Sequence, residues 1–161
     1  MKPPANAKPQ TPLTLKPERV HLDYRAVMQL GRSEALPPFD EPGRCHGVAE
    51  YRGLALFPDN QVVMHRYQGR YDLTDGSGDF EGEAVWRFAN GASITARYLG
   101  QARRGTRSVT FDGHLERVEG TGNFAGVRGS GRFGGLRSEP VSSGGTTEVE
   151  GQLILDLDPV A

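Results

Sequence analysis

The amino-acid sequence predicts an all-β protein whose strands form one eight-stranded antiparallel β-barrel. Apolar and polar residues alternate with a period of two in segment after segment, which is typical of strands that bury one face. Turn signals rich in Gly, Pro, Asn and Asp separate these segments at even spacing. No segment sustains the 3.6-residue period of an amphipathic helix. Short antiparallel strands at such intervals favour a meander that closes into a barrel or packs as a sandwich.

The composition suits one such domain and excludes several classes of protein. The 161 residues are enough to bury a substantial core, and 22 glycines with a mean hydropathy of -0.52 fit a turn-rich β-protein with one wetted face per strand. A formal net charge of -1 gives no support for a nucleic-acid or anionic-membrane partner. The single cysteine, Cys45, excludes an internal disulfide and a cysteine-cluster zinc site.

The N-terminal residues are expected to stay outside the barrel. Residues 1–17 are rich in proline and lysine, and they lack the apolar stretch of a secretory signal. No run of the chain reaches the ~18 apolar residues of a membrane helix. We therefore expect a flexible, disordered tail at 1–17, a single barrel domain over 18–161, and a soluble, cytoplasmic protein.

The first three strands show the clearest alternation. The first is expected at residues 18–30, before a Pro-rich loop at 31–43 that carries Phe39. A Pro-Asp-Asn turn separates the second strand, at 45–57, from the third, at 61–73.

The later strands follow equally plain turn signals. A Thr-Asp-Gly-Ser-Gly turn ends at Gly78, and Asn90-Gly91 is the strongest hairpin signal in the chain. A basic turn is expected at 101–106, and the seventh strand is irregular because it is rich in glycine. The fourth to eighth strands are expected at 80–88, at 92–98, at 109–116, within 129–139 and at 147–157.

The apolar faces favour a barrel over a sandwich. Very small residues share these faces with large rings, as Ala49 and Gly53 do with Tyr51, and Ala84 does with Trp86. An eight-stranded barrel has an interior just wide enough for side chains or one small ligand, and inward glycine and alanine leave space in it. The alternative is that the small residues only relieve crowding against the rings and that no cavity exists.

A glycine-rich segment near the end of the chain resembles a known barrel family. Residues 120–129, Gly-Thr-Gly-Asn-Phe-Ala-Gly-Val-Arg-Gly, resemble the T-G-G-S-G-x-F-x-G-V-x-G segment of allene oxide cyclases and the G-G-T-G-x-F-x-x-A-x-G run of dirigent proteins. The resemblance covers roughly residues 78–135. It implies a calycin-like eight-stranded barrel whose relatives are often trimers, with small apolar or phenolic substrates and cofactor-free chemistry.

The same resemblance implies structural roles and transfers no catalytic residue. The structural positions are Gly120, Gly122, Phe124, Gly126 and Gly129. Allene oxide cyclases place a carboxylate inside the barrel, whereas the strand glutamates of this chain fall on polar, outward faces; these are Glu81, Glu83, Glu116, Glu148 and Glu150.

The inward faces supply the candidate site residues. His65 is the one inward group that titrates near neutral pH, so we take His65 and Tyr67 as candidate catalytic residues. The alternative is a core histidine bonded to a tyrosine hydroxyl. Phe39 is expected in a lid over the mouth, and the other residues expected to line the lumen are Tyr24, Cys45, Tyr51, Trp86, Tyr98 and Phe111.

Neither a metal nor a cofactor is expected. The four histidines show no metal-ligand spacing. The glycine spacing of 120–125 matches a dinucleotide fingerprint, but no helical pattern follows it, and that motif requires one.

Three functions are consistent with these observations, the third being a structural barrel whose role lies on its oligomer interface. The leading hypothesis is a cofactor-free cyclase or isomerase acting on a small apolar, polyunsaturated or polyketide-like molecule in the lumen. The alternative is a lipocalin-like binding protein without chemistry, which would be favoured if every polar group in the lumen were bonded to the protein. Apolar residues also interrupt the polar outer faces and predict a homo-oligomer, a dimer or trimer; these are Leu54, Leu56, Val85 and Ile154.

Overall fold

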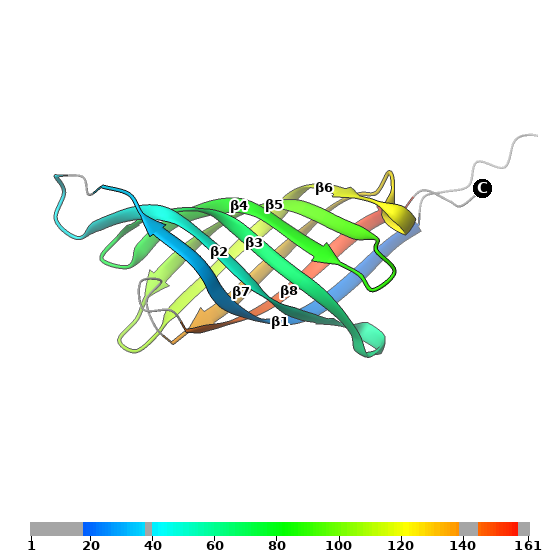
Figure 1. The fold of residues 1–161 in the computed structure, drawn as a ribbon, viewed down its shortest axis with the longest axis horizontal. Coiled ribbons are helices and arrows are strands. Elements are labelled where there is room, and N and C mark those ends of the chain that lie inside the picture. Colours follow the sequence, from blue (N-terminus) through cyan, green and yellow to red (C-terminus); the bar gives the residue numbers. More distant parts are fainter. Residues whose placement is uncertain (1–17, 38–39, 139–144, 158–161) are drawn as a thin grey trace, which may run out of the picture.

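The computed structural model describes residues 18–37, 40–138 and 145–157, which form a closed barrel of eight antiparallel strands (Figure 1). Consecutive strands pair with one another, and β8 pairs with β1 to close the sheet. The all-β, eight-stranded prediction is therefore confirmed, while the predicted tail at 1–17 lies outside the described residues. The strands are β1 (Glu18–Ala35), β2 (Arg44–Phe57), β3 (Gln61–Thr74), β4 (Ser77–Arg87), β5 (Ser93–Arg104), β6 (Val109–Gly120), β7 (Arg128–Arg137) and β8 (Thr146–Leu157).

Several strands are longer than their own residue pattern predicts. β1 continues through 31–35, a segment expected to be loop, with a register shift between Leu30 and Arg32 where it pairs with β2. β5 continues to Arg104 through the expected basic turn, because each of these residues pairs with one on β6. Hydrogen-bonded pairing with a neighbouring strand thus extends β1 and β5 into segments where charged, exposed side chains interrupt the alternation of apolar and polar residues.

Inward-facing glycines make space for aromatic rings from neighbouring strands. A Cβ added at these glycines would lie 2.3 to 2.6 Å from a carbon of the ring, closer than real Cβ atoms approach other atoms. The pairs are Gly151 with Tyr24, Gly135 with Phe111, Gly113 with Phe133, and Gly100 with Phe80. Each ring therefore lies against the barrel wall, in the space that a side chain of the facing strand would otherwise fill.

One end of the barrel is closed by aromatic side chains. At the end where β1 begins and β8 finishes (Figure 1), Phe57, Phe88 and Phe124 pack together, with ring centroids 5.7 Å apart for the first pair and 4.9 Å for the second. A 3₁₀ turn at Gly122–Phe124 carries Phe124 into this group.

The glycine-rich segment shapes this closed end. Gly122 and Gly126 have φ of +61° and +79°, which only glycine adopts without strain. Gly120 and Gly129 are close-approach positions, where an added Cβ would meet Phe124 O at 2.4 Å and Ile154 O at 2.2 Å.

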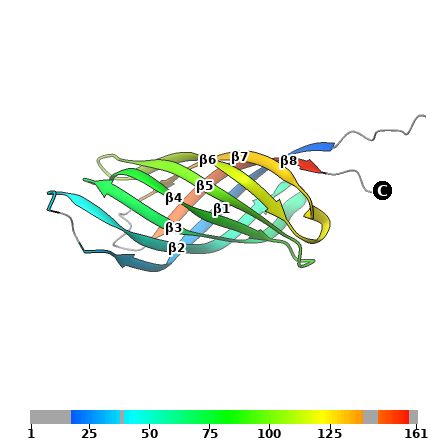
Figure 2. The ribbon, with the colours of Figure 1, turned by 90° about the horizontal axis from the view of Figure 1, so that it is seen from above.

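The opposite end is the mouth of the barrel. Figures 1 and 2 show the strands running obliquely along the longest axis of the molecule, so the mouth and the closed end lie far apart. β1, β3, β5 and β7 end at the mouth, and β2, β4, β6 and β8 begin there. The expected lid residue, Phe39, falls outside the described residues.

Exposed apolar side chains gather on the outside of β1, β2 and β3. We call this group the outer apolar patch; its members are Val27, Leu54, Leu56, Val62 and Met64. Leu54 pairs in register with Val27 on one side and Met64 on the other, so the side chains are adjacent. Val85 and Ile154, also expected at an oligomer interface, are half-buried. The described residues include no helix of the length and apolar character needed to cross a bilayer.

Replacing a ring-contacting glycine should destabilise the barrel far more than replacing its neighbour. At Gly135 an added Cβ meets the backbone oxygen of Glu148 at 2.1 Å and Phe111 Cζ at 2.3 Å, whereas at Gly134 the nearest atom is 3.4 Å away. We expect Gly135→Ala to lower the free energy of unfolding by about 1–3 kcal/mol through overpacking, and Gly134→Ala to leave it unchanged or slightly raised. Chemical denaturation measures both, and equal losses would contradict this account of the glycines.

Self-association stays a prediction, and the outer apolar patch makes it testable. We expect the wild-type protein to be a dimer or trimer and Leu54→Glu to be a monomer, because a buried carboxylate on an apolar interface is unfavourable. Val48→Glu, on the exposed face of β2 six residues from Leu54 toward the mouth, is the matched control and should keep the oligomer. Size-exclusion chromatography with light scattering distinguishes these results, and a monomeric wild-type protein at micromolar concentration would refute the prediction.

Candidate functional site

A narrow cavity of about 100 Å³ extends inward from the mouth between the strands. Its wall is almost entirely aromatic and aliphatic. An apolar cavity of roughly 150 Å³ in another protein holds benzene, so this cavity offers space for about one ring-sized portion of a ligand. A larger molecule would extend from the cavity into the mouth.

Most of the residues predicted to line the lumen do line this cavity. They are Tyr24, Tyr51, His65, Tyr67, Trp86, Tyr98 and Phe111. Further rings on the wall, which sequence analysis did not single out, are Tyr71, Phe80 and Phe133. The small residues do relieve crowding against rings, as the alternative expected, but a cavity exists, which that alternative excluded.

Cys45 is a correction to the predicted lining. Its side chain is exposed, and it is not part of the cavity wall. The alternation places it on the inward side of β2, but pairing with β1 ends at Gly47, two residues further in. Cys45 therefore lies at the rim, beyond the point where β1 covers it.

The rings on the wall pack against one another in an ordered way. The His65 and Trp86 rings stack with centroids 4.7 Å apart and 13° between planes, and Tyr24 meets Trp86 edge to face at 5.6 Å. Tyr51 and Tyr67 stack at 4.8 Å. These contacts fix the orientation of the polar atoms that the rings carry.

His65 is neutral and has a defined tautomer. Its Nδ1 lies 2.9 Å from the carbonyl oxygen of Val85, which can only accept, so Nδ1 carries the proton and Nε2 is left as an acceptor. Burial lowers the pKa of His65 from 6.5 to about 4, although the bond to Val85 opposes this. The partner is thus a backbone carbonyl, not the tyrosine hydroxyl that the core-histidine alternative expected.

The tyrosines around the cavity are neutral as well. Burial raises the pKa of Tyr24, Tyr67 and Tyr98, and also that of Tyr51, where the nearby Arg137 opposes it. Every one of these hydroxyls is therefore a neutral donor or acceptor at physiological pH.

Several buried polar atoms near the cavity have no hydrogen-bond partner in the described part of the chain. They are Tyr51 OH, Trp86 Nε1, Thr147 Oγ1, and Nε and Nη1 of Arg137. Buried polar groups are almost always bonded, because an unpaired one is costly. Such a set around one cavity can pair with ordered water or with a bound molecule.

Arg137 is the residue that sequence analysis missed. It is the last residue of β7, it lines the cavity, and its guanidinium carbon lies 5.3 Å from the centre of the Tyr51 ring. The glycine-rich strand offered little alternation, but counting by two from Phe133 through Gly135 places Arg137 inward.

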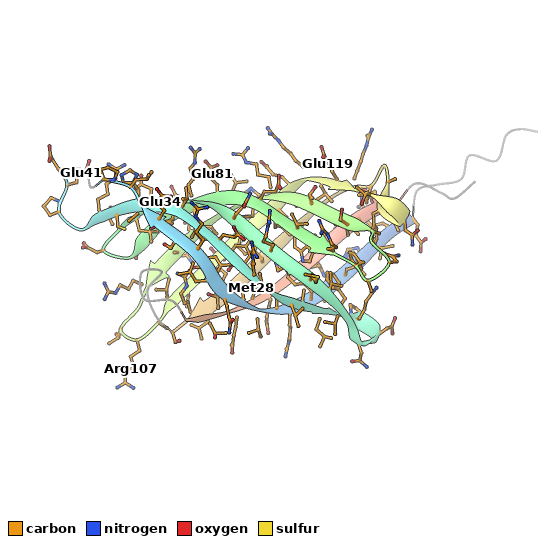
Figure 3. The ribbon with its side chains drawn as sticks, viewed as in Figure 1. Met28, Glu34, Glu41, Glu81, Arg107 and Glu119 are labelled. Carbon is orange, nitrogen blue, oxygen red and sulfur yellow. The ribbon has the colours of Figure 1, made fainter. Side chains whose placement is uncertain are left out.

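No carboxylate belongs to the cavity wall as the structure describes it. Glu81 and Glu119 lie on the outer side of the ribbon (Figure 3), and Glu81 pairs there with Arg70 and Arg97. Among the described residues no three His, Cys, Asp or Glu side chains are grouped so as to hold a metal ion.

Comparison with known proteins supports the fold. No protein-family model matches the sequence, and no curated protein does. A solved structure, that of a pterocarpan synthase dirigent protein, resembles the barrel with a TM-score of 0.50 over 92% of this chain and 91% of that one. This chain thus shares its barrel fold with that dirigent protein. The identity of 14% shows a shared fold and nothing finer, so the resemblance to allene oxide cyclases in particular stays a prediction.

The burial of neutral His65 should make stability fall in acid. The unfolded chain protonates this histidine below pH 6.5, whereas the folded protein does so only near pH 4. The contribution of neutral His65 to the free energy of unfolding is therefore fully present above pH 6.5 and is lost as the pH falls toward 4. Between pH 7 and 4.5 we expect wild-type protein to lose about 2 kcal/mol more unfolding free energy than His65→Gln.

The control for this effect is an exposed histidine. Replacing His114, on the outside of β6, should leave the acid-induced loss at the wild-type value. Denaturant titrations at the two pH values give the comparison. Equal losses in wild type and His65→Gln would contradict a buried, neutral His65.

Proposed function

We propose that this protein is a cofactor-free cyclase or isomerase that acts on a small apolar, polyunsaturated or polyketide-like molecule held in the barrel. One observation carries the proposal: the aromatic cavity is bordered by oriented polar atoms with no partner in the described chain. A lumen built only to carry an apolar molecule has no need of them. The likeness to a dirigent protein named as a pterocarpan synthase also supports small-molecule chemistry in such a barrel.

Confinement supplies most of the catalysis in this proposal. The stacked rings restrict a flexible substrate to a few conformations, so that reacting atoms already lie near attack distance before the reaction begins. Exclusion of water from the closed end keeps reactive intermediates from hydrolysis. Neither contribution requires an acidic or basic side chain, in agreement with a cavity wall that has no carboxylate.

The polar atoms divide into donors and one acceptor. His65 cannot polarise a carbonyl, because its single N–H is bonded to Val85; its Nε2 instead accepts a hydrogen bond or proton from a substrate hydroxyl or enol. Trp86 Nε1 and Tyr51 OH are the groups positioned to donate to a substrate oxygen. Tyr67, stacked on Tyr51, adds a second neutral phenol.

The test combines binding with turnover. Displacement of the neutral fluorophore N-phenyl-1-naphthylamine reports binding of a panel of polyenes, fatty acids and phenolic polyketides, and mass spectrometry reports conversion. We expect wild type to convert at least one ligand that it binds. His65→Gln and Tyr67→Phe should slow conversion by about tenfold or more while changing binding by less than about threefold.

His114→Gln, on the outer surface, is the matched control and should convert at the wild-type rate. Binding without any conversion would favour the alternative function, a lipocalin-like carrier. If neither the fluorophore nor any ligand binds, both the proposed enzyme function and the carrier function are wrong.

A further inference from the structure

The side chain of Arg137 has an unusual environment for an arginine of this protein. Its Nε and Nη1 are buried, and no carboxylate of the described chain pairs with it. Several arginines on the outside of the barrel pair with acidic side chains; they include Arg19, Arg25, Arg44, Arg97 and Arg103. Arg70, which also borders the cavity, pairs with Glu81, whereas Arg137 has no carboxylate partner among the described residues.

A buried guanidinium without a counter-ion is unfavourable for folding. Such a group stays protonated in proteins, so it cannot avoid the cost by losing its charge. The Tyr51 ring, 5.3 Å away, offsets part of the cost by a cation–π contact. A bound anion would offset the part of this free-energy cost that the cation–π contact leaves.

The neighbours of Arg137 are donors of the kind that an anion requires. Tyr51 OH is buried and unpartnered, and Thr147, paired with Arg137 across the β7–β8 ladder, is fully buried with its hydroxyl beside that of Tyr67. Neutral phenol and hydroxyl groups supply hydrogen bonds without adding charge. Among the described residues of the cavity wall Arg70 is paired with Glu81, so Arg137 leaves a net charge of +1. This charge matches a carboxylate better than a doubly charged phosphate.

We propose that the ligand of this cavity carries a carboxylate, bound by Arg137 and Tyr51 at the mouth, with its apolar portion directed inward. This inference rests on the proposed function, because it assumes that the lumen is the ligand site. Arg137 ends β7 at the mouth, while His65 and Trp86 lie deeper, so the carboxylate anchors the ligand and the apolar portion reaches the proposed reactive groups. Guanidinium groups favour carboxylates because they form two parallel charged hydrogen bonds.

A pair of probes that differ only in charge tests the assignment. 3-Phenylpropanoate and 3-phenylpropanamide share one ring and one chain length, and isothermal titration calorimetry at pH 7 measures both. We expect wild type to bind the acid at least tenfold more tightly than the amide. Arg137→Met keeps an unbranched apolar stem and should bind both probes with the affinity of the wild type for the amide.

Arg132→Met is the matched control on the same strand. Arg132 is exposed on the outer face, so this variant should keep the wild-type preference for the acid. Equal binding of acid and amide by wild type, or a preference that survives in Arg137→Met, would overturn the assignment.

The stability of the ligand-free protein distinguishes an anchoring role from a structural one. If Arg137 is uncompensated, Arg137→Met should raise the melting temperature, by about 3 °C. A fall in melting temperature would mean that Arg137 already stabilises the fold through a partner in the chain, and the assignment would be wrong.

The neutral fluorophore N-phenyl-1-naphthylamine separates failure of this inference from failure of the proposed function. If the fluorophore binds and the acid shows no advantage over the amide, the lumen remains the ligand site and Arg137 does not select a carboxylate. If neither the fluorophore nor the two probes bind, the proposed function fails and this inference fails with it.

Discussion

The close contact between aromatic rings and inward-facing glycines determines the interior of this barrel. A ring that lies where a facing Cβ would be, as Phe111 does over Gly135, rests against the wall and does not cross the lumen. Eight strands leave only a narrow interior, so without these contacts the rings would fill it. The residual cavity, its aromatic wall and the orientation of its polar atoms all follow from this arrangement.

The two ends of the barrel consequently differ in chemical character. One end is sealed by Phe57, Phe88 and Phe124, and the mouth carries the cationic Arg137. Between them burial keeps His65 and the tyrosines uncharged. A molecule with an acidic group at one end and an apolar body would match a cationic mouth and an apolar interior. Its body would lie among rings that carry oriented donors and one acceptor.

Local alternation was enough to predict the eight strands and seven residues of the cavity, because a period of two assigns each side chain to a face. It does not give depth along the barrel axis, and for this reason Cys45 was expected in the lumen although β1 ends before covering it. Strand length depends on pairing with distant residues, so the extension of β1 past Gly31 was not predictable. Arg137 was missed because glycines leave β7 with almost no side-chain pattern, and the lack of a partner for its guanidinium is visible only in three dimensions.

The central claim is that the cavity exists to hold a small molecule, and native mass spectrometry of protein purified from its own host tests it most directly. The account predicts one additional mass per chain, which organic extraction would release as a discrete, largely apolar compound bearing a carboxylate. Protein that carries no such compound, and whose thermal stability does not change with any fatty acid or polyene, would contradict the account. The rings and glycines would then serve only to fill the barrel.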